Sequence, residues 1–286
     1  QNKIIGFLLK RETQNALTRC VLEGGPGQGK STISQYLCQV HRARLLNKSI
    51  DLKKIDKSIF DFPIRIPIKI DLRHIAEWIQ KENPYSESIN DYFFDLNWRN
   101  TLESFIITHI QFHSGIQEFE TNDLIEILSV SNVLMVFDGF DEIPNLEIRQ
   151  NVVEFVDKGL NRLSRNIASL QAIITSRPAA FSEKISFSTI KYPHIEIRDI
   201  DSEVIEEYID KWRAAKNLDA KEKLKLRRLA RTKLRLPHLS DLTKNPMQLA
   251  IFISLLRTKA ESLPHKRTAI YDSYIGLLFD REAEKH

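Results

Sequence analysis

The stretch Gly24-Gly25-Pro26-Gly27-Gln28-Gly29-Lys30-Ser31-Thr32 decides the fold expected for this chain. It fits the phosphate-binding loop pattern, in which two glycines bracket four residues and are followed by lysine and serine. Glycines let consecutive backbone N–H groups point inward around a phosphate. In this pattern Lys30 reaches the β- and γ-phosphates and the Ser31 hydroxyl holds Mg²⁺. We therefore expect the residues from Gly25 to Thr32 to bind a nucleotide.

The sequence around the loop argues against a glycine-rich turn that matches the pattern by chance. Cys20-Val21-Leu22 is a short apolar strand before the loop. Ile33, Tyr36, Leu37 and Val40 follow it at helical spacing. Strand, loop and helix in this order are the arrangement that the motif requires.

Composition places the chain among ordinary globular proteins. Its 286 residues suit one large or two small domains, and 42% are hydrophobic and 28% charged. A net charge of +4 does not by itself indicate a nucleic-acid binder. Cys20 and Cys38 are expected to be buried and reduced, which favours the cytoplasm.

No apolar run is long enough to cross a bilayer, so no membrane partner is expected. The start at Gln1 and the charged helical end at His286 suggest a piece of a longer protein.

Strand and helix patterns alternate through the first two thirds of the chain. Apolar strands are predicted at 20–22, 64–70, 133–137, 172–174 and 194–197, with helices at 102–110, 124–128 and 148–163. The aromatic segment 83–100 is expected to be a loop and short helix whose rings fill a core. This alternation predicts an α/β fold with a central parallel sheet between two layers of helices. Together with the phosphate-binding loop, it leads us to expect a three-layer P-loop fold of ASCE type. We assign residues 1–200 to this nucleotide-binding domain.

From Asp201 onward only helical patterns are found. A helix opening at Asp201 carries an apolar face ending at Trp212, and further helices are predicted at 221–234, 247–259 and 267–282. We assign residues 201–286 to a small helical domain.

A second motif is the apolar strand Val133–Phe137, which ends in Asp138 and is followed by Gly139-Phe140-Asp141-Glu142. The Asp138 carboxylate is expected to accept from waters around the Mg²⁺ held by Ser31. Hydrolysis needs an acid that orients or deprotonates the attacking water, and Asp141 and Glu142 are the candidates. The alternative is that these two acids cap the helix after Pro144.

Thr175-Ser176-Arg177-Pro178 follows the strand at 172–174. Ligands bind at the carboxyl edge of such sheets, so Arg177 is a candidate contact to the γ-phosphate that distinguishes ATP from ADP. The alternative is a surface arginine before a helix.

Two weaker signals concern nucleic acid and the choice of nucleotide. Eight cations between Lys221 and Arg235 interleave with leucines, and a solvated face over a leucine stripe is favoured over a nucleic-acid contact. Asn47-Lys48-Ser49-Ile50 lacks the aspartate that would complete a guanine-reading motif, so ATP is preferred over GTP. The histidines and cysteines show no zinc-ligand spacing.

GGPGQGKST, VFDGFDE, TSRP, Asn245-Pro246, Leu263-Pro264 and the segment 271–278 together resemble a NACHT domain of the STAND class of signalling NTPases. The distinguishing mark is a small residue, Gly139, after the Mg²⁺ aspartate, with the acidic pair just beyond it. AAA+ proteins instead place the catalytic acid directly after the aspartate. The resemblance covers nearly the whole chain and looks bacterial.

The resemblance implies an ATP/ADP switch with slow turnover, self-association in the ATP state, and effector and sensor domains outside this sequence, often in phage defence. It implies that Pro246 lies near the adenine and ribose, although Lys244 stands where the family often has glycine. It also implies a winged-helix domain beyond His286. Two alternatives stay open: a nucleic-acid-stimulated motor ATPase, and a scaffold that binds nucleotide without hydrolysing it.

Overall fold

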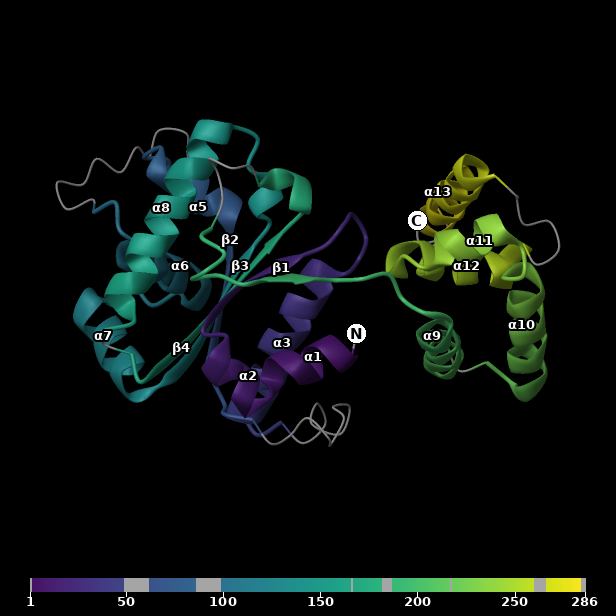
Figure 1. Ribbon diagram of the computed structural model, residues 1–286, viewed down its shortest axis with the longest axis horizontal. Coiled ribbons are helices and arrows are strands. Elements are labelled where there is room, and N and C mark those ends of the chain that lie inside the picture. The colour runs from purple at the N-terminus through teal and green to yellow at the C-terminus, as the bar shows by residue number, and fades with distance from the viewer. Residues whose placement is uncertain are drawn as a thin grey trace. The chain divides into compact units, whose positions relative to one another are not determined.

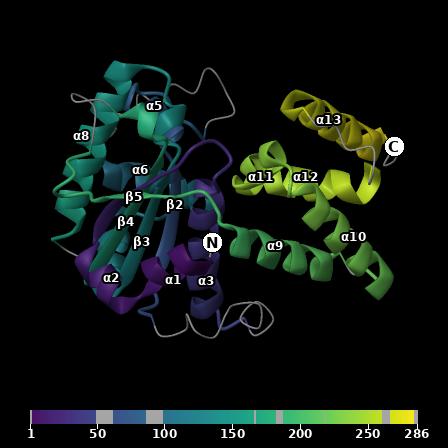
Figure 2. The same cartoon turned by 45° about the vertical axis from the view of Figure 1, so that its right-hand side comes forward.

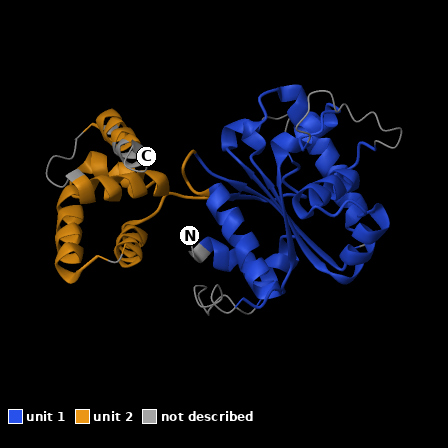
Figure 3. Cartoon of the chain, turned by 180° about the vertical axis from the view of Figure 1, so that it is seen from behind, with its two compact units in different colours: residues 1–25, 30–196 blue, residues 26–29, 197–286 orange. Residues whose placement is uncertain are grey.

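The computed structural model describes residues 2–48, 62–85, 99–165, 167–181, 187–216, 218–259 and 266–283. The chain divides into two compact units (Figure 3). The first comprises residues 1–25 and 30–196, and the second comprises residues 26–29 and 197–286. Four residues of the phosphate-binding loop therefore group with the second unit.

The first unit is built on a parallel sheet (Figure 1). The order of its strands is β2-β3-β4-β1-β5. The strands are β1 (Arg19–Glu23), β2 (Ile66–Asp71), β3 (Asn132–Asp138), β4 (Ser169–Ser176) and β5 (His194–Glu196). Each predicted strand is thus confirmed, with bounds that shift by up to three residues at either end. Because the strands are parallel, their carboxyl ends meet at one edge of the sheet.

The sequences of β2, β3 and β4 suit the positions of these strands in the sheet. β3 and β4 lie inside the sheet, and all their residues between the two ends are buried, as expected for strands covered on both faces. β2 lies at an edge, where Pro67 can be accommodated although it has no N–H to donate.

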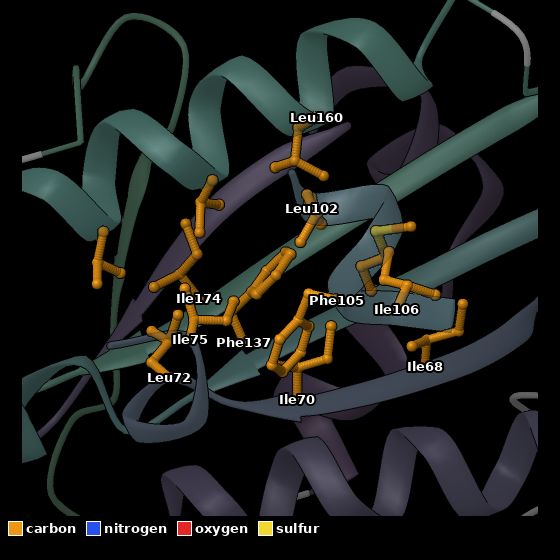
Figure 4. Packing of buried hydrophobic residues seen from close by; sticks show 14 of the residues in the cluster. Ile68, Ile70, Leu72, Ile75, Leu102, Phe105, Ile106, Phe137, Leu160 and Ile174 are labelled. Atoms are coloured by element: carbon orange, nitrogen blue, oxygen red, sulfur yellow. The ribbon is translucent and has the colours of Figure 1, made fainter. Parts of the chain in front are cut away.

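Helices cover both faces of this sheet (Figure 2). α3 (Lys30–Leu45) packs against β2, β3 and β4, and α1 (Asn2–Leu9) contacts α3. A core of buried hydrophobic residues fills the other face, beneath α5 (Leu72–Ile79), α6 (Leu102–Ser114), α7 (Thr121–Val130) and α8 (Leu146–Leu163). Figure 4 shows the strand side chains Ile70, Phe137 and Ile174 gathered in this core with Phe105 and Leu160. The unit therefore has three layers.

Several helices were not predicted. α1 and α2 (Arg11–Ala16) precede the first strand, and α5 begins directly after β2. Asp71 ends β2 and also caps α5, because its side chain accepts from the Arg73 N–H at 2.9 Å. Of the aromatic segment 83–100, residues 86–98 lie outside the described residues, while Tyr85 packs against the core of the first unit.

The second unit is helical in its described residues from 197 onward. Its helices are α9 (Ser202–Ala215), α10 (Ala220–Lys233), α11 (Pro237–Thr243), α12 (Pro246–Lys259) and α13 (Arg267–Ala283). α9 begins where a helix was predicted, and the Asp201 side chain caps it by accepting from the Val204 N–H. α12 contributes Leu249, Phe252 and Ile253 to the centre of this core, with no exposed surface. Across the described part of the chain, no helix is long and apolar enough to cross a membrane.

Candidate functional site

The phosphate-binding loop joins β1 to α3, and α3 begins at Lys30. Gly27 and Gly29 have φ values of 74° and 92°, a conformation that residues with a Cβ rarely adopt. The Lys30 ammonium donates to the carbonyl oxygens of Gly24 at 2.7 Å and Gly25 at 3.3 Å. Burial lowers the pKa of Lys30, and the nearby Asp141 carboxylate opposes that shift. Thr32 is exposed in the first turn of α3.

Loop residues 26–29 contact the start of α12 within the second unit. The Asn245 amide donates to the Pro26 carbonyl at 2.9 Å, and the Met247 N–H donates to the Gly27 carbonyl at 3.2 Å. A Cβ on Gly27 would lie 2.9 Å from Asn245 Oδ1, so this glycine is also required by close packing. Pro246, the residue between these two contacts, is the first residue of α12. Gln28 donates to Asp199 at 3.1 Å.

Asp138, at the carboxyl end of β3, is surrounded by donors from three elements. Ser31 Oγ donates to Asp138 Oδ1 at 3.3 Å, and the Thr175 hydroxyl donates to the same oxygen. Lys69 Nζ lies 2.8 Å from Asp138 Oδ2. Thr175, which is fully buried, also accepts from the Gly139 N–H at 2.9 Å. One threonine therefore fixes both the carboxylate and the backbone that follows it.

The oxygens of Ser31 and Asp138 fit the requirements of Mg²⁺. This cation prefers oxygen ligands, and it is usually bound by one or two carboxylates together with substrate phosphates and waters. No group of three or more His, Cys, Asp or Glu side chains among the described residues is placed to hold a metal by itself. The phosphates of a nucleotide would therefore complete the ligand set.

Asp141 and Glu142 lie in a 3₁₀ turn, Phe140–Glu142, that follows Gly139. They do not cap the next helix, because the Asn145 side chain caps α8 by accepting from the N–H groups of Glu147 and Ile148. The alternative role weighed for them from the sequence is therefore wrong.

The two acids have different partners. Asp141 Oδ2 lies 2.8 Å from Arg177 Nε, and Asp141 Oδ1 accepts from the Arg177 N–H at 3.2 Å. The Asp141 side chain is only 10% exposed, and this arginine occupies both of its oxygens. Glu142 is 48% exposed, and its Oε2 lies 3.2 Å from Arg73 Nε. Glu142 is therefore the more accessible of the two carboxylates.

A cavity of about 300 Å³ lies beside Asp138 and Glu142 in the first unit. Its other lining residues come mainly from β2, α5 and α6: Lys69, Asp71, Arg73, His74, His109, His113 and Gly139. Asp141 is not part of this lining. Burial, together with His113 and His74, lowers the pKa of His109 to about 4, so this imidazole is neutral at physiological pH. Burial opposes ionisation of Asp71, yet hydrogen bonds from Arg73 lower its pKa.

The predicted site residues fall into two groups. Gly25, Lys30, Ser31, Asp138, Asp141, Glu142 and Arg177 belong to the first unit, at the carboxyl ends of β1, β3 and β4. Pro26, Gly27, Gln28, Gly29 and Pro246 belong to the second unit. The sequence reasoning missed Lys69, Arg73 and Thr175. The charged residues at the end of β2 were a usable signal, because ligands bind at that edge of parallel sheets.

The strand order and the positions of the loop and Asp138 give the fold its class. β4 separates the loop strand β1 from the aspartate strand β3. This additional strand marks the ASCE type of P-loop NTPase fold, with a helical region after the sheet, as predicted.

Similarity to known proteins is found among solved structures. No family model matches this sequence, and no curated protein matches it. The Orc1 protein of Aeropyrum pernix in complex with DNA is similar, with 14% identity and a TM-score of 0.46 over 99% of this chain and 65% of that one. AMPPCP-bound DnaA from Aquifex aeolicus is also similar, with 12% identity and a TM-score of 0.44 over 90% of this chain and 61% of that one. The chain thus spans less than two thirds of each of these proteins.

Proposed function

We propose that this chain is an ATP/ADP-binding, slowly hydrolysing switch module of NACHT type. The observation that carries the proposal is the position of Asp138, whose Oδ1 lies 3.3 Å from the hydroxyl of the phosphate-loop residue Ser31. Loop and aspartate are thus close enough to share one metal-bound nucleotide. The acidic pair beyond Gly139 supports hydrolysis as well as binding.

Each side chain has a distinct role in this proposal. The N–H groups of residues 25–32 and the Lys30 ammonium bind the phosphates, and Ser31 and Asp138 hold Mg²⁺. When bound, Mg²⁺ supplies charge neutralisation to the phosphate oxygens. Arg177 contacts the γ-phosphate, and Pro246 lies near the base and ribose.

We assign the attacking water to Glu142 rather than to Asp141. Glu142 lines the same cavity as Asp138 and is half-exposed, so a water has access to its carboxylate. Asp141 is nearly buried, and both of its oxygens are occupied by Arg177. Asp141 therefore positions Arg177, while Glu142 orients or deprotonates the water.

The wider assignment rests on the NACHT resemblance. In this assignment residues 1–200 form the nucleotide domain and residues 201–286 a small helical domain, within a longer protein that carries effector, winged-helix and sensor domains. Self-association in the ATP state and a role in antiviral defence follow from that resemblance. Cys20 and Cys38 are both free thiols, which supports a cytoplasmic location.

A motor ATPase stimulated by nucleic acid is the second candidate, and α10 is the feature that favours it. Lys221, Lys225 and Arg228 are exposed along this helix. Arg231 is neutralised by Glu206 of α9, at 3.0 Å, which reduces the free positive charge. The switch is therefore preferred.

Phosphate release from ATP tests the proposed function. The wild-type chain is expected to release phosphate slowly and at the same rate with and without DNA or RNA. Glu142→Gln should slow release by about 100-fold or more while keeping nucleotide binding, because general-base catalysis contributes at least about this factor. Asp141→Asn should have a smaller effect. Stimulation by DNA would favour the motor, and a Glu142→Gln variant with unchanged release would refute the assigned role.

A further inference from the structure

The Asp138 carboxylate has an ammonium partner that none of the sequence motifs supplies. The hydroxyls of Ser31 and Thr175 both contact Oδ1, which leaves Oδ2 to Lys69 at 2.8 Å. Arg73 is engaged elsewhere, with its guanidinium on Asp71 at 2.6 Å and on Glu142 at 3.2 Å. Among the described residues, Lys69 is thus the one cation paired with Asp138.

The geometry of β2 explains why Lys69 reaches this carboxylate. Ile68 and Ile70 point into the core beside Phe105 and Ile106 of α6 (Figure 4). Because side chains alternate along a strand, Lys69 lies on the opposite face of β2, which α3 covers. β2 and β3 are in parallel register, with Lys69 beside Val136, two residues before Asp138. The Lys69 side chain therefore extends along the sheet, past Val136, to reach Asp138.

The pair is placed where a metal cation would otherwise neutralise the carboxylate. Asp138 is 13% exposed, and a carboxylate at this depth is costly without a positive partner. Lys69 is 39% exposed and also lines the cavity of about 300 Å³, so its ammonium has room to move away. A divalent cation close to Asp138 would repel the ammonium from its present position.

We propose that Lys69 is an internal counter-ion that competes with Mg²⁺ for Asp138 and thereby sets the Mg²⁺ concentration at which nucleotide binds. The proposal rests on the proposed function, since it concerns the same carboxylate. In the nucleotide-free chain Lys69 keeps Asp138 neutralised and oriented. The Lys69 ammonium must move away from Asp138 Oδ2 before Asp138 can bind a metal. Because this movement breaks an ion pair, it lowers the affinity for the metal.

Removing the ammonium should therefore strengthen metal binding. The test titrates MgCl₂ into protein with a fluorescent ATP analogue, and separately titrates Mn²⁺ alone with detection by electron paramagnetic resonance. Lys69→Met should lower the half-saturating concentration of both metals by roughly 1.5-fold to fivefold, the range expected for a partly exposed ion pair. Lys69→Arg, which keeps the charge, should remain near wild type. Lys158→Met removes an exposed lysine of α8 that is paired with Glu154 at 3.0 Å, and it controls for net charge.

The two titrations separate this proposal from the proposed function. If the wild type binds no nucleotide but Lys69→Met gains a Mn²⁺ site that Asp138→Asn abolishes, the counter-ion role stands and the proposed function fails. If nucleotide binds but Lys69→Met and wild type have the same half-saturating Mg²⁺ and Mn²⁺, the counter-ion role is overturned. It is also overturned if Lys69→Arg matches Lys69→Met. Should Lys69→Met fail to fold, Lys69→Gln removes the same charge and is measured in its place.

Discussion

Arg177 holds Asp141 by two contacts at once, an ion pair of 2.8 Å through Nε and a backbone hydrogen bond of 3.2 Å through its N–H. These contacts tie the end of β4 to the turn that follows β3. The residue predicted to sense the γ-phosphate is therefore oriented by one of the two acids predicted to take part in hydrolysis.

This pairing predicts energetic coupling between the two side chains. Arg177→Ala and Asp141→Asn should each lower the free energy of unfolding by no more than about 1 kcal/mol, because the arginine is half-exposed and solvent weakens the pair. The double variant should lose less than the sum of the two, by roughly 0.5 kcal/mol, in urea denaturation. Strict additivity would show that the two side chains act independently.

Thr175 should be required for its hydroxyl rather than for its size. Thr175→Val keeps the shape but leaves the Gly139 N–H without its acceptor, so we expect a loss of about 1–3 kcal/mol in the free energy of unfolding. Thr175→Ser keeps the hydroxyl and is the matched control. Equal stability of the two variants in urea denaturation would contradict the bridging role.

Gly159 of α8 has no room for a side chain. A Cβ there would lie 2.5 Å from the Leu102 Cβ on α6. Gly159→Ala should therefore destabilise the chain by about 1–3 kcal/mol through overpacking, despite the better helix propensity of alanine. A Cβ on Gly276 of α13 would meet no atom within 4 Å, so Gly276→Ala should be neutral or stabilising by up to about 1 kcal/mol. Thermal melts of both variants check this contrast.

Stability should fall on mild acidification because of two histidines, of which His41 is buried and His109 is half-buried. Burial and the charges of Arg65 and Arg44 lower the pKa of His41 to about 3, and that of His109 is lowered to about 4. The unfolded chain, with a pKa of about 6.5 for histidine, then binds more protons between these values, so the free energy of unfolding decreases as pH falls.

The size of this effect can be measured. Between about pH 7 and about pH 5, each histidine should contribute a loss of up to about 2 kcal/mol in urea denaturation. His41→Gln should remove roughly half of the combined loss. A free energy of unfolding that is equal at the two pH values would exclude neutral histidines in the folded state.

The sequence predicted those parts of the fold that are indicated by a pattern of consecutive residues. β3 is a continuous apolar run, and the loop before α3 has a fixed motif, so both could be recognised without their neighbours. α5 was missed because Asp71 ends a strand and starts a helix with no turn signal between them.

The site was predicted only where a motif carries the chemistry. Lys69, Arg73 and Thr175 join the site through the pairing of β2 with β3 and of β3 with β4, and this strand order cannot be read from spacing along the chain. From the sequence, Asp141 and Glu142 were equal candidates for the acid that acts on the attacking water. In the structure Asp141 pairs with Arg177 and Glu142 with Arg73, and these different partners assign them different roles.

Isothermal titration calorimetry of ATP with Mg²⁺, on the wild-type chain and on Lys30→Ala, measures whether the loop at residues 24–32 binds nucleotide. Circular dichroism and urea denaturation establish that the variant is folded. The proposed function predicts stoichiometric binding by the wild type and no detectable binding by folded Lys30→Ala, because the lysine ammonium lies against the loop that binds the phosphates. Equal affinity of the two proteins for ATP would contradict the assignment of this loop as the nucleotide site.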